Sequence, residues 1–551
     1  MPVTLKIKTR SPLHIGTGRD LEAFEYVIYD GFFWRLDINR VTAFLLEAAG
    51  DQAVDRLVDW IDQQVQKLER ASNNREQSRI RRSITLRTFL QKELKRSDLD
   101  SRLLQQIERV ARYGMRTPHR DFNQLIREQI KDPDGRLYVP GSSLKGALRT
   151  CLLYQVLVEA DKGTRSAWLH QMEKKLGNLG RHPRRRDAVR FAQWLEQEVF
   201  YCGMLRKGRP SYGDAQFDLL KFLMVSDSNA VPPEEGVVVN VEIYRPKSKP
   251  QPQAPPVEAL DAEVELQVRL GFDTKFIRRV WQLYERRAKG LGSEIWIDLP
   301  EKFKRLYGIS VQEAAAMDEE ALERHLLNRV RKACRQFSEA LRRFEINWCG
   351  RAEQGATESF ARQLKRFYSQ LPADTVRLGW ASGFAAVTVF LALYRDEQWS
   401  EVLKRMLKSF FRINASLKHF PTSRRMATDA DGTMSAVPLG WVELVWPWES
   451  PVSEQEASKS ETATEAAEKA EDFWLDKIGR NSKNIVAEVV DNSQLPFKIR
   501  VFVRGLENEV FLCGKANPRN LKIGQRILVE VADWNPKKQR PIMFRVQSVR
   551  V

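Results

Sequence analysis

The sequence predicts an α+β protein that ends in a separate small β-barrel. Up to about residue 447, short runs with a period of two, typical of strands, are interspersed with longer runs at helical spacing. Residues 449–472 then lack aromatic side chains and are acidic, which is typical of a linker. Beyond this break, five short alternating runs are separated by loops rich in Gly, Asn and Pro. Such a pattern predicts a small closed sheet, most simply an OB-like barrel.

Four segments follow from this pattern. Residues 1–272 contain a strand, a hairpin, helices and a late returning strand, the order expected of a ferredoxin-like unit with large helical insertions. Residues 273–448 predict a helical region and a second unit of the same kind. Residues 449–480 predict an acidic flexible linker, and residues 481–551 predict the barrel.

Length, charge and cysteine content limit the class of protein. A chain of 551 residues is too long for one core, and its 42% apolar residues can form sizeable ones. A formal charge of +18 favours a polyanionic partner, such as RNA, DNA or an acidic membrane. The cysteines are odd in number and form no Cys-x-x-Cys pair, which indicates a reducing compartment and disfavours a disulfide framework or a zinc site. They are Cys151, Cys202, Cys334, Cys349 and Cys513.

Neither a signal peptide nor a membrane span is expected. The first four residues lead directly into a strand pattern. The longest nearly uncharged run, residues 378–394, is about one turn short of a spanning helix and is interrupted by Gly379 and Gly383. We therefore expect a cytoplasmic protein without a membrane partner.

The stretch 138–150 is the most informative part of the sequence. A glycine-serine loop runs into a helix there, because Leu144, Leu148 and Leu152 recur at helical spacing. Ser142 or Ser143 can cap this helix by accepting a backbone N–H bond. The first turn would then offer unpaired N–H donors and the positive end of the helix dipole to a phosphate.

Two cationic residues extend this predicted phosphate-binding site. Lys145 and Arg149 lie four residues apart, on one face of the helix. An ordinary serine-capped helix after a strand explains the same residues equally well. The Gly-x4-Gly-Lys-[Ser/Thr] order of a Walker loop is absent, so a nucleotide-binding P-loop is excluded.

Residues 140–149, Pro-Gly-Ser-Ser-Leu-Lys-Gly-Ala-Leu-Arg, resemble the signature of the RAMP superfamily, the RNA-binding subunits of CRISPR effector complexes. Three further segments narrow the resemblance: residues 11–18, residues 378–384, and residues 420–425 followed by 438–442. In this order they resemble the type III-A (Csm complex) subunit that caps the 3′ end of the guide RNA. The resemblance covers about residues 1–447 and leaves the last hundred or so unexplained.

The resemblance implies that the glycine-rich segments bind the guide RNA (crRNA). Backbone donors without side-chain obstruction suit phosphate contact, and arginines beside Phe420 suit single-stranded RNA, although a core-facing phenylalanine with solvated arginines explains the latter too. The implied partners are crRNA, target RNA, and the backbone and small subunits of the complex. We predict three groups of RNA-binding residues: first Gly141, Ser142, Ser143, Lys145 and Arg149; second His14, Gly16, Gly18 and Arg19; third Gly379, Ser382, Gly383, Arg424 and Arg425.

No catalytic constellation is predicted. Of the six histidines only His14 lies in a glycine-rich loop, where with Lys145 it could form the base and cation of a metal-independent ribonuclease. A packed or RNA-stacking histidine explains it more simply, and the resemblance implies a binder. Asp20 is the nearest candidate for the acidic residue with which the backbone subunits cleave target RNA. Metal-binding and hydrolase motifs are absent, so neither a metal nor another cofactor is expected.

Three alternatives stay open at this point. A related RAMP endoribonuclease that matures precursor guide RNA would use His14 as its base. A membrane-surface or scaffold protein is disfavoured, because no basic amphipathic anchor is present. The barrel, basic through Lys515, Arg519, Lys522, Lys537 and Lys538, could bind single strands or dock a protein.

Overall fold

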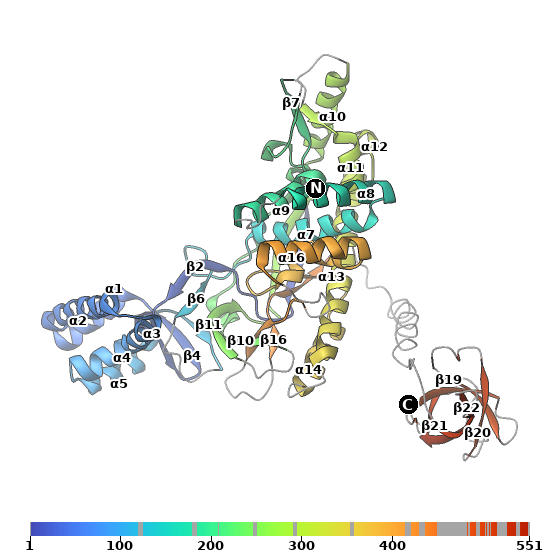
Figure 1. Ribbon diagram of the computed structural model, residues 1–551. Helices are drawn as coiled ribbons and strands as arrows, with labels where there is room; N and C mark the ends of the chain where they lie inside the picture. Colours follow the sequence, from blue (N-terminus) through green and yellow to red (C-terminus); the bar gives the residue numbers. More distant parts are fainter. Residues whose placement is uncertain are drawn as a thin grey trace. The chain divides into compact units, whose positions relative to one another are not determined.

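The computed structural model places two compact units along the chain, Met1–Pro447 and Trp448–Val551 (Figure 1). Up to residue 448 it describes all residues except 1, 119–124, 179–184, 208, 246–250, 290–294, 353–357, 414–419 and 429–435. Beyond 448 it describes residues 482, 485–491, 496–501, 503, 506, 509–514, 526–535 and 540–548. The predicted linker and the five lysines and arginines predicted for the barrel lie outside the described residues. Helices and strands are mixed throughout, so the α+β prediction is confirmed.

One five-stranded sheet has the order β14-β17-β1-β12-β9. Its strands are β1 (Val3–Thr9), β9 (Leu223–Val225), β12 (Glu265–Phe272), β14 (Thr375–Arg377) and β17 (Trp441–Val445). β1 is central and runs antiparallel to both β12 and β17. Leu5 and Ile7 are buried while Lys6 is exposed, as their alternation predicts.

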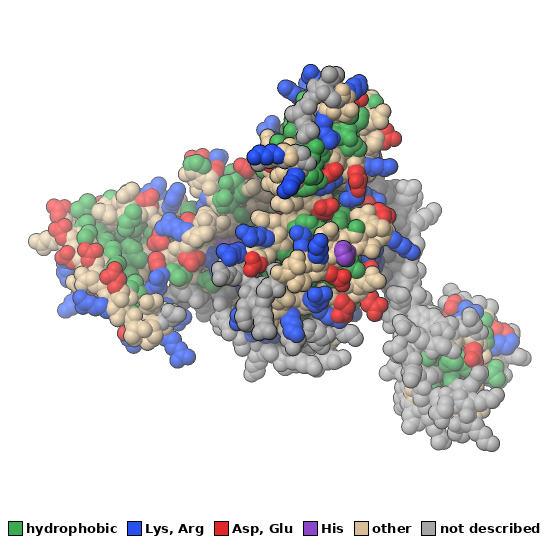
Figure 2. Space-filling view, turned by 45° about the horizontal axis from the view of Figure 1, so that its top comes forward, with side chains coloured by type: hydrophobic (Ala, Val, Ile, Leu, Met, Phe, Trp, Pro, Cys, Tyr) green, Lys and Arg blue, Asp and Glu red, His purple; other side chains and the backbone are tan. Residues whose placement is uncertain are grey.

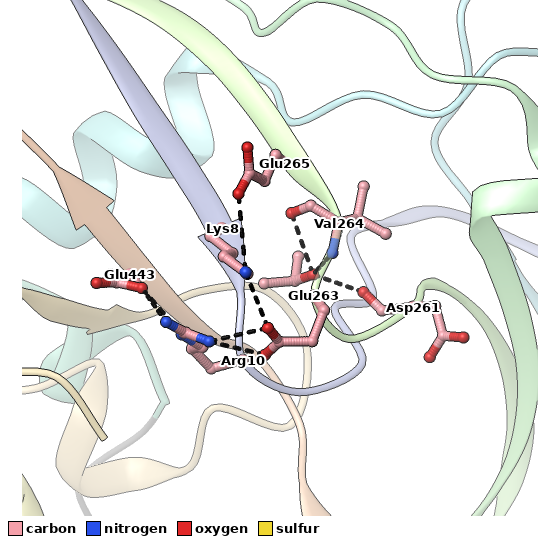
Figure 3. Close-up of polar contacts among 8 residues, drawn as sticks. Lys8, Arg10, Asp261, Glu263, Val264, Glu265 and Glu443 are labelled. Carbon is pink, nitrogen blue, oxygen red and sulfur yellow. Dashed lines mark hydrogen bonds and ion pairs between the residues drawn. The ribbon is translucent and has the colours of Figure 1, made fainter. Parts of the chain in front are cut away.

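Two cations attach β1 to its neighbours (Figure 3). Arg10 places Nη2 2.5 Å from Glu443 Oε2 on β17 and Nη1 2.9 Å from Glu263 Oε1. Lys8 Nζ lies 3.0 Å from Glu263 Oε2 and 3.7 Å from Glu265 Oε1 on β12. Burial acts to raise the pKa of Glu263, but hydrogen bonds from Lys8 and Arg10 hold that pKa below its usual value. These ion pairs connect segments from opposite ends of the unit.

A nine-stranded sheet follows the order β2-β6-β11-β10-β5-β4-β3, with β15 paired to β10 and β16 paired to β15. Its strands are β2 (Gly16–Leu21), β3 (Tyr26–Tyr29), β4 (Phe32–Leu36), β5 (Ala111–Arg116), β6 (Ile126–Gln129), β10 (Gly236–Tyr244), β11 (Gln251–Leu260), β15 (Arg424–Thr428) and β16 (Val437–Pro438). Both large sheets therefore contain strands from before and after residue 272, and the boundary at that position stays a prediction. β2 includes the end of the glycine-rich segment 11–18, and β11 includes the proline-rich residues 251–256.

Six consecutive helical segments form what we call the helical arm, which extends to one side of the sheets in Figure 1. They are α1 (Ile38–Ala49), α2 (Asp51–Arg70), α3 (Asn74–Ser83), α4 (Leu86–Thr88), α5 (Ser97–Gln105) and α6 (Ile107–Val110), with a π-helical turn at Phe89–Glu93. Leu45, Trp60, Phe89 and Leu103 belong to its core, which also includes Val27 and Leu36 from the adjoining hairpin. The arm thus buries its own apolar side chains on the hairpin that precedes it.

The other helices include the long helix α13, which packs against α7 and α14 and contacts strands β12 and β14. They are α7 (Gly141–Glu159), α8 (Lys162–Gly177), α9 (Arg185–Phe200), α10 (Thr274–Ala288), α11 (Leu299–Tyr307), α12 (Val311–Ala316), α13 (Glu319–Ala352), α14 (Glu358–Gln370), α15 (Phe390–Tyr394) and α16 (Glu397–Phe411). A small third sheet, β13-β7-β8, comprises β7 (Gly203–Arg206), β8 (Arg209–Ser211) and β13 (Ile295–Ile297).

The second unit contains a closed barrel of order β18-β19-β20-β22-β21. Its strands are β18 (Ile485–Asp491), β19 (Phe497–Val501), β20 (Val510–Gly514), β21 (Arg526–Asn535) and β22 (Arg540–Ser548). β20 and β22 pair in parallel, whereas the other neighbours are antiparallel. Ile485, Val501, Phe511 and Phe544 are among the residues of its core.

Shortening a buried side chain of β1 to alanine should destabilise the first unit far more than shortening an exposed one. Ile7 is 1% exposed, so we expect Ile7→Ala to lower the free energy of unfolding by about 3 kcal/mol. Lys6→Ala on the opposite face should change it by less than about 0.5 kcal/mol. Urea denaturation followed by tryptophan fluorescence compares the two variants, and equal shifts of their midpoints would contradict the central place of β1.

Candidate nucleic-acid interface

The signature stretch forms the beginning of α7, but the predicted serine cap is wrong. The helix starts at Gly141, so Ser142 and Ser143 lie inside its first turn, and no side chain caps it. The Gly141 N–H donates to Asp227 Oδ1 at 2.7 Å. A Cβ on Gly141 would lie only 2.5 Å from the carbonyl oxygen of Val225. The glycine is therefore needed for close backbone packing, and a carboxylate of the protein already accepts from the helix N-terminus.

Both predicted cations of α7 have partners within the protein. Lys145 Nζ donates to the carbonyl oxygen of Leu223 at 2.6 Å, and burial lowers the pKa of this lysine. Arg149 lies 2.8 Å from Asp218 Oδ2 through Nη1 and 3.4 Å from Glu196 Oε2 through Nη2. These contacts hold α7 against Leu223, Asp218 and Glu196.

His14 is a packed histidine. Its Nδ1 lies 2.6 Å from the carbonyl oxygen of Glu258, and only 2% of its surface is exposed. Burial lowers the pKa of His14 to about 4, so its ring is neutral at neutral pH. A Cβ on Gly16 would lie 2.8 Å from His14 Nε2, and the rings of His14 and Trp380 are perpendicular, with centroids 5.9 Å apart. The loop after β1 is therefore packed around this ring.

The three glycine-rich segments of the first unit's core bind one another through their backbones. The Trp380 N–H donates to the carbonyl oxygen of His14 at 2.8 Å, and the Leu378 N–H donates to that of Gly440 at 2.7 Å. The Gly440 N–H in turn donates to the carbonyl oxygen of Pro12 at 2.9 Å. The amides of Leu378, Trp380 and Gly440 are therefore already paired within the protein and are not free for phosphate.

Two of the glycines occupy positions that other residues could not. Gly379 has a φ of +73°, and a Cβ there would lie 2.3 Å from the carbonyl oxygen of His14. Gly440 has a φ of +85°, and a Cβ there would lie 2.1 Å from the carbonyl oxygen of Leu378. Ser382 is buried and donates to the carbonyl oxygen of Gly379 at 2.6 Å. Gly379 and Ser382 therefore shape the loop from within.

Arg424 also belongs to the interior. Its Nε lies 2.6 Å from Glu345 Oε2, with both side chains less than 5% exposed, and its Cζ lies 4.7 Å from the centroid of the Trp348 ring. We therefore leave Arg424 out of the interface. Its neighbour Arg425 is exposed, and together with Gly383 it lines a cavity of about 270 Å³.

The second predicted group is exposed where it continues into β2. Gly16, Gly18 and Arg19 are all exposed on this strand, which forms one edge of the nine-stranded sheet. Arg19 Nη2 lies 2.5 Å from Glu25 Oε1 and keeps 56% of its side chain exposed. β2 pairs with β6 in a register that sets Asp20 opposite Arg127. The exposed strand β2 therefore lies beside Arg127 of β6.

Trp380 lies between two arginines of the nine-stranded sheet. Sequence analysis did not connect these three residues. The Cζ of Arg127 lies 4.5 Å from the centroid of the tryptophan ring, and that of Arg425 lies 5.4 Å from it. Trp380 packs on a face of the sheet that includes Val257 and Ala427. Arg127 is level with Val257, and Arg425 shares its strand face with Ala427. The strand order β6-β11-β10-β15 therefore brings the arginines from opposite flanks.

Neither of these guanidinium groups has a carboxylate partner in the part of the chain that the structure describes. Arg127 Nε is a buried donor without an acceptor. By contrast, Arg149 and Arg424 are neutralised by Asp218 and Glu345. We call Arg127, Trp380 and Arg425 the arginine–tryptophan stack. Arg127 and Trp380 were missed because the sheet pairing that joins them is not visible locally; the tryptophan between two glycines was the available signal.

Charge alone does not mark an interface on the face of this unit that Figure 2 shows. Figure 2 shows Lys and Arg side chains interspersed with Asp and Glu over the face that it presents. Among the described residues, no group of three or more His, Cys, Asp or Glu side chains could hold a metal ion. No helix in the described ranges is long and apolar enough to cross a membrane. The five cysteines are buried, and none of them forms a disulfide.

A family model described as the RAMP superfamily matches residues 6–350. This chain belongs to the RAMP superfamily. Residues 140–149, which resemble the family signature, form the beginning of α7, and in this RAMP chain their cations contact the region of β9 and α9. The other two predicted groups meet around His14 and Trp380.

The solved structures that are similar to this RAMP chain include the following two. A chain of the cryo-EM structure of the Csm–crRNA–target RNA ternary complex of a type III-A CRISPR-Cas system is 23% identical, with a TM-score of 0.48; the match covers 81% of this chain and 100% of that one. The crystal structure of T. onnurineus Csm5 is 21% identical, with a TM-score of 0.48, and covers 80% of this chain and 99% of that one. No curated protein matches the sequence.

The buried His14 should make the stability of the first unit sensitive to acid. Its pKa is about 4 in the folded protein and about 6.5 when unfolded, so the unfolded state gains the proton first. Stability that is complete above about pH 6.5 should therefore fall by about 3 kcal/mol as the pH drops to 4.

Urea midpoints measured across this pH range test the effect. We expect His14→Gln to lose most of this pH dependence, whereas His170→Gln, at an exposed position on α8, should keep it. A His14→Gln variant with the unchanged pH dependence would show that another group is responsible.

Proposed function

We propose that this chain is a non-catalytic crRNA-binding subunit of a type III-A CRISPR interference complex. It would bind the 3′ portion of the guide RNA and cap the filament of backbone subunits. Membership of the RAMP superfamily supports RNA binding, and the order of the signature segments supports the capping role. The observation on which the proposal rests most heavily is the arginine–tryptophan stack, with two guanidinium groups that have no carboxylate partner among the described residues.

The stack has the chemistry of a single-stranded RNA site. A guanidinium that lies over an indole ring can still use its N–H donors to bind a phosphate in bidentate fashion. Such contacts grip the backbone, which is what a guide-binding subunit needs, because base pairing with the target reads the sequence. The exposed Gly18 and Arg19 on the neighbouring β2 would extend this surface along the sheet edge.

The proposed partners follow from the same role. They are crRNA, the target RNA paired with it, and the backbone and small subunits of a Csm complex, acting in the cytoplasm. Of the signature helix, we retain Ser142 as a candidate contact because it is exposed, with Ser143, which is half-buried. Lys145 and Arg149 could reach RNA only by exchanging Leu223 and Asp218 for phosphate.

We also propose the finer domain assignment. Residues 1–272 and 273–448 would each contribute a ferredoxin-like unit, residues 449–480 a linker, and residues 481–551 an OB-like domain. A closed five-stranded ring with β20 and β22 side by side and parallel supports the last assignment. On its outer surface, Lys498 is level with Leu512 and Arg500 with Val510, and all four are exposed, a mixture that suits single strands or a protein.

Removal of both cations of the stack should weaken guide binding. For the double variant Arg127→Gln and Arg425→Gln, we expect the Kd for crRNA to rise by about 10- to 100-fold at about 0.15 M salt, since two phosphate contacts are lost. The slope of log K against log salt should flatten by about 1.4, which is about 0.7 for each contact to a single strand.

Fluorescence anisotropy with labelled crRNA at several salt concentrations measures both quantities. The matched control is Arg324→Gln with Arg343→Gln, two exposed arginines of α13 that are paired with Glu320 and Glu339. The control removes the same charge and should leave the slope nearly unchanged. Equal effects in the two double variants would show that only net charge matters and would remove the stack from the interface.

The alternative function is a metal-independent endoribonuclease with His14 as its base. A ring that is buried and has a pKa of about 4 is poorly suited to this role. We expect the purified protein to leave precursor guide RNA intact in EDTA, as judged on denaturing gels. A defined cut that His14→Ala abolishes and His170→Ala preserves would establish the enzyme instead.

A further inference from the structure

The outer face of α2 has a charge opposite to that of the protein as a whole. With about 100° of rotation per residue, five acidic side chains fall within an arc of about 80° on this helix. All five are exposed. They are Asp51, Asp55, Asp59, Asp62 and Glu69, and we call them the acidic stripe.

No cation among the described residues neutralises the acidic stripe. None of its five carboxylates has an ion-pair or hydrogen-bond partner among the described residues. The basic residues of α2 lie further round the helix, and Arg56 donates instead to the carbonyl oxygen of Glu93. Aspartates four residues apart, as Asp51, Asp55 and Asp59 are, repel one another by a few tenths of a kcal/mol per pair. The helix dipole favours only the acids of the first turn, so it accounts for Asp51 and not for the rest.

Apolar side chains lie along one side of the stripe. Val58 is 55% exposed and Val65 is 46% exposed, and they are two helical turns apart on α2. Leu46, on the adjoining helix α1, is 42% exposed. The inward face of α2 is already filled by Leu57 and Trp60, so these exposed residues are not needed for the core of the arm. Figure 2 shows hydrophobic and acidic side chains next to one another on this arm.

We infer that this face of the helical arm docks a protein subunit whose surface has an apolar centre surrounded by lysines and arginines. In a chain with a net charge of +18, a face with five unpaired carboxylates repels RNA and attracts a basic protein surface. The exposed valines provide the apolar contact that a specific interface needs at its centre. The inference rests on the proposed function only in that the partner is sought within the same ribonucleoprotein.

The docking face is separate from the arginine–tryptophan stack. The stack is formed by β6, β15 and the loop after β14, whereas the arm has its own core. Substitutions on the outside of α2 should therefore change protein association without changing the affinity for crRNA. This separation allows the two proposals to fail independently.

Photocrosslinking in the assembled complex tests the inference. The full chain is co-expressed with the backbone and small subunits and crRNA, with a photoreactive phenylalanine analogue at position 58, and crosslinked peptides are identified by mass spectrometry. We expect a crosslink to a protein, in a peptide bearing lysine or arginine. The same analogue at position 67, exposed on the other side of α2, should give at most a tenth of that yield.

Charge variants supply the second readout. The triple variant Asp55→Asn, Asp59→Asn and Asp62→Asn should lower the crosslink yield at position 58 at least tenfold, with the Kd for crRNA changed less than twofold. The matched control, Glu301→Gln, Glu320→Gln and Glu339→Gln, removes three exposed carboxylates elsewhere and should keep the yield.

Three results would overturn the inference: crosslinks to RNA, no protein crosslink, or the same loss of yield in both triple variants. If the proposed function is wrong, the result differs: the purified complex or chain will contain no crRNA. A protein crosslink in the absence of crRNA would therefore support the docking face and contradict the RNA-binding role.

Discussion

The first unit depends on the position of β1 between β12 and β17. Arg10, at the end of β1, and Glu443, on β17, are 433 positions apart in the chain and in direct contact. This pairing brings the loop after β1 against the loop that follows β14 and against the residues that precede β17. Gly379 and Gly440 then allow backbone to meet backbone at distances that a side chain would prevent. The fold of this unit is therefore closed by contacts between its two ends.

The same packing explains the arrangement of the proposed RNA site. Because the Trp380 amide is bonded to the carbonyl oxygen of His14, the indole is fixed on the sheet between Arg127 and Arg425. In the proposed site, the loops around Gly379 and Gly440 hold the indole in place, and the arginines on the strands would provide the charge. His14 contributes as a packed ring, which is consistent with a binding role and requires no catalytic one.

Local patterns predicted the elements better than their contacts. The alternation in β1, the hairpin of β3 and β4, and the helical spacing of α7 all follow from side-chain periodicity and turn residues. The carboxylates that meet Gly141, Arg149 and Arg424 could not be foreseen, since they come from 86, 69 and 79 positions away. The strand β11 is rich in proline, which does not favour a strand; its pairing with β10 contains register shifts that accommodate such a sequence.

The central claim is that the guide RNA lies across the sheet at Trp380. Ultraviolet crosslinking of the assembled ribonucleoprotein, with mapping of both the peptide and the nucleotide, tests it most directly. The account predicts crosslinks from peptides containing Trp380 or Arg425 to nucleotides in the 3′ portion of crRNA. Crosslinks confined to other surfaces, with these peptides recovered unmodified, would contradict it.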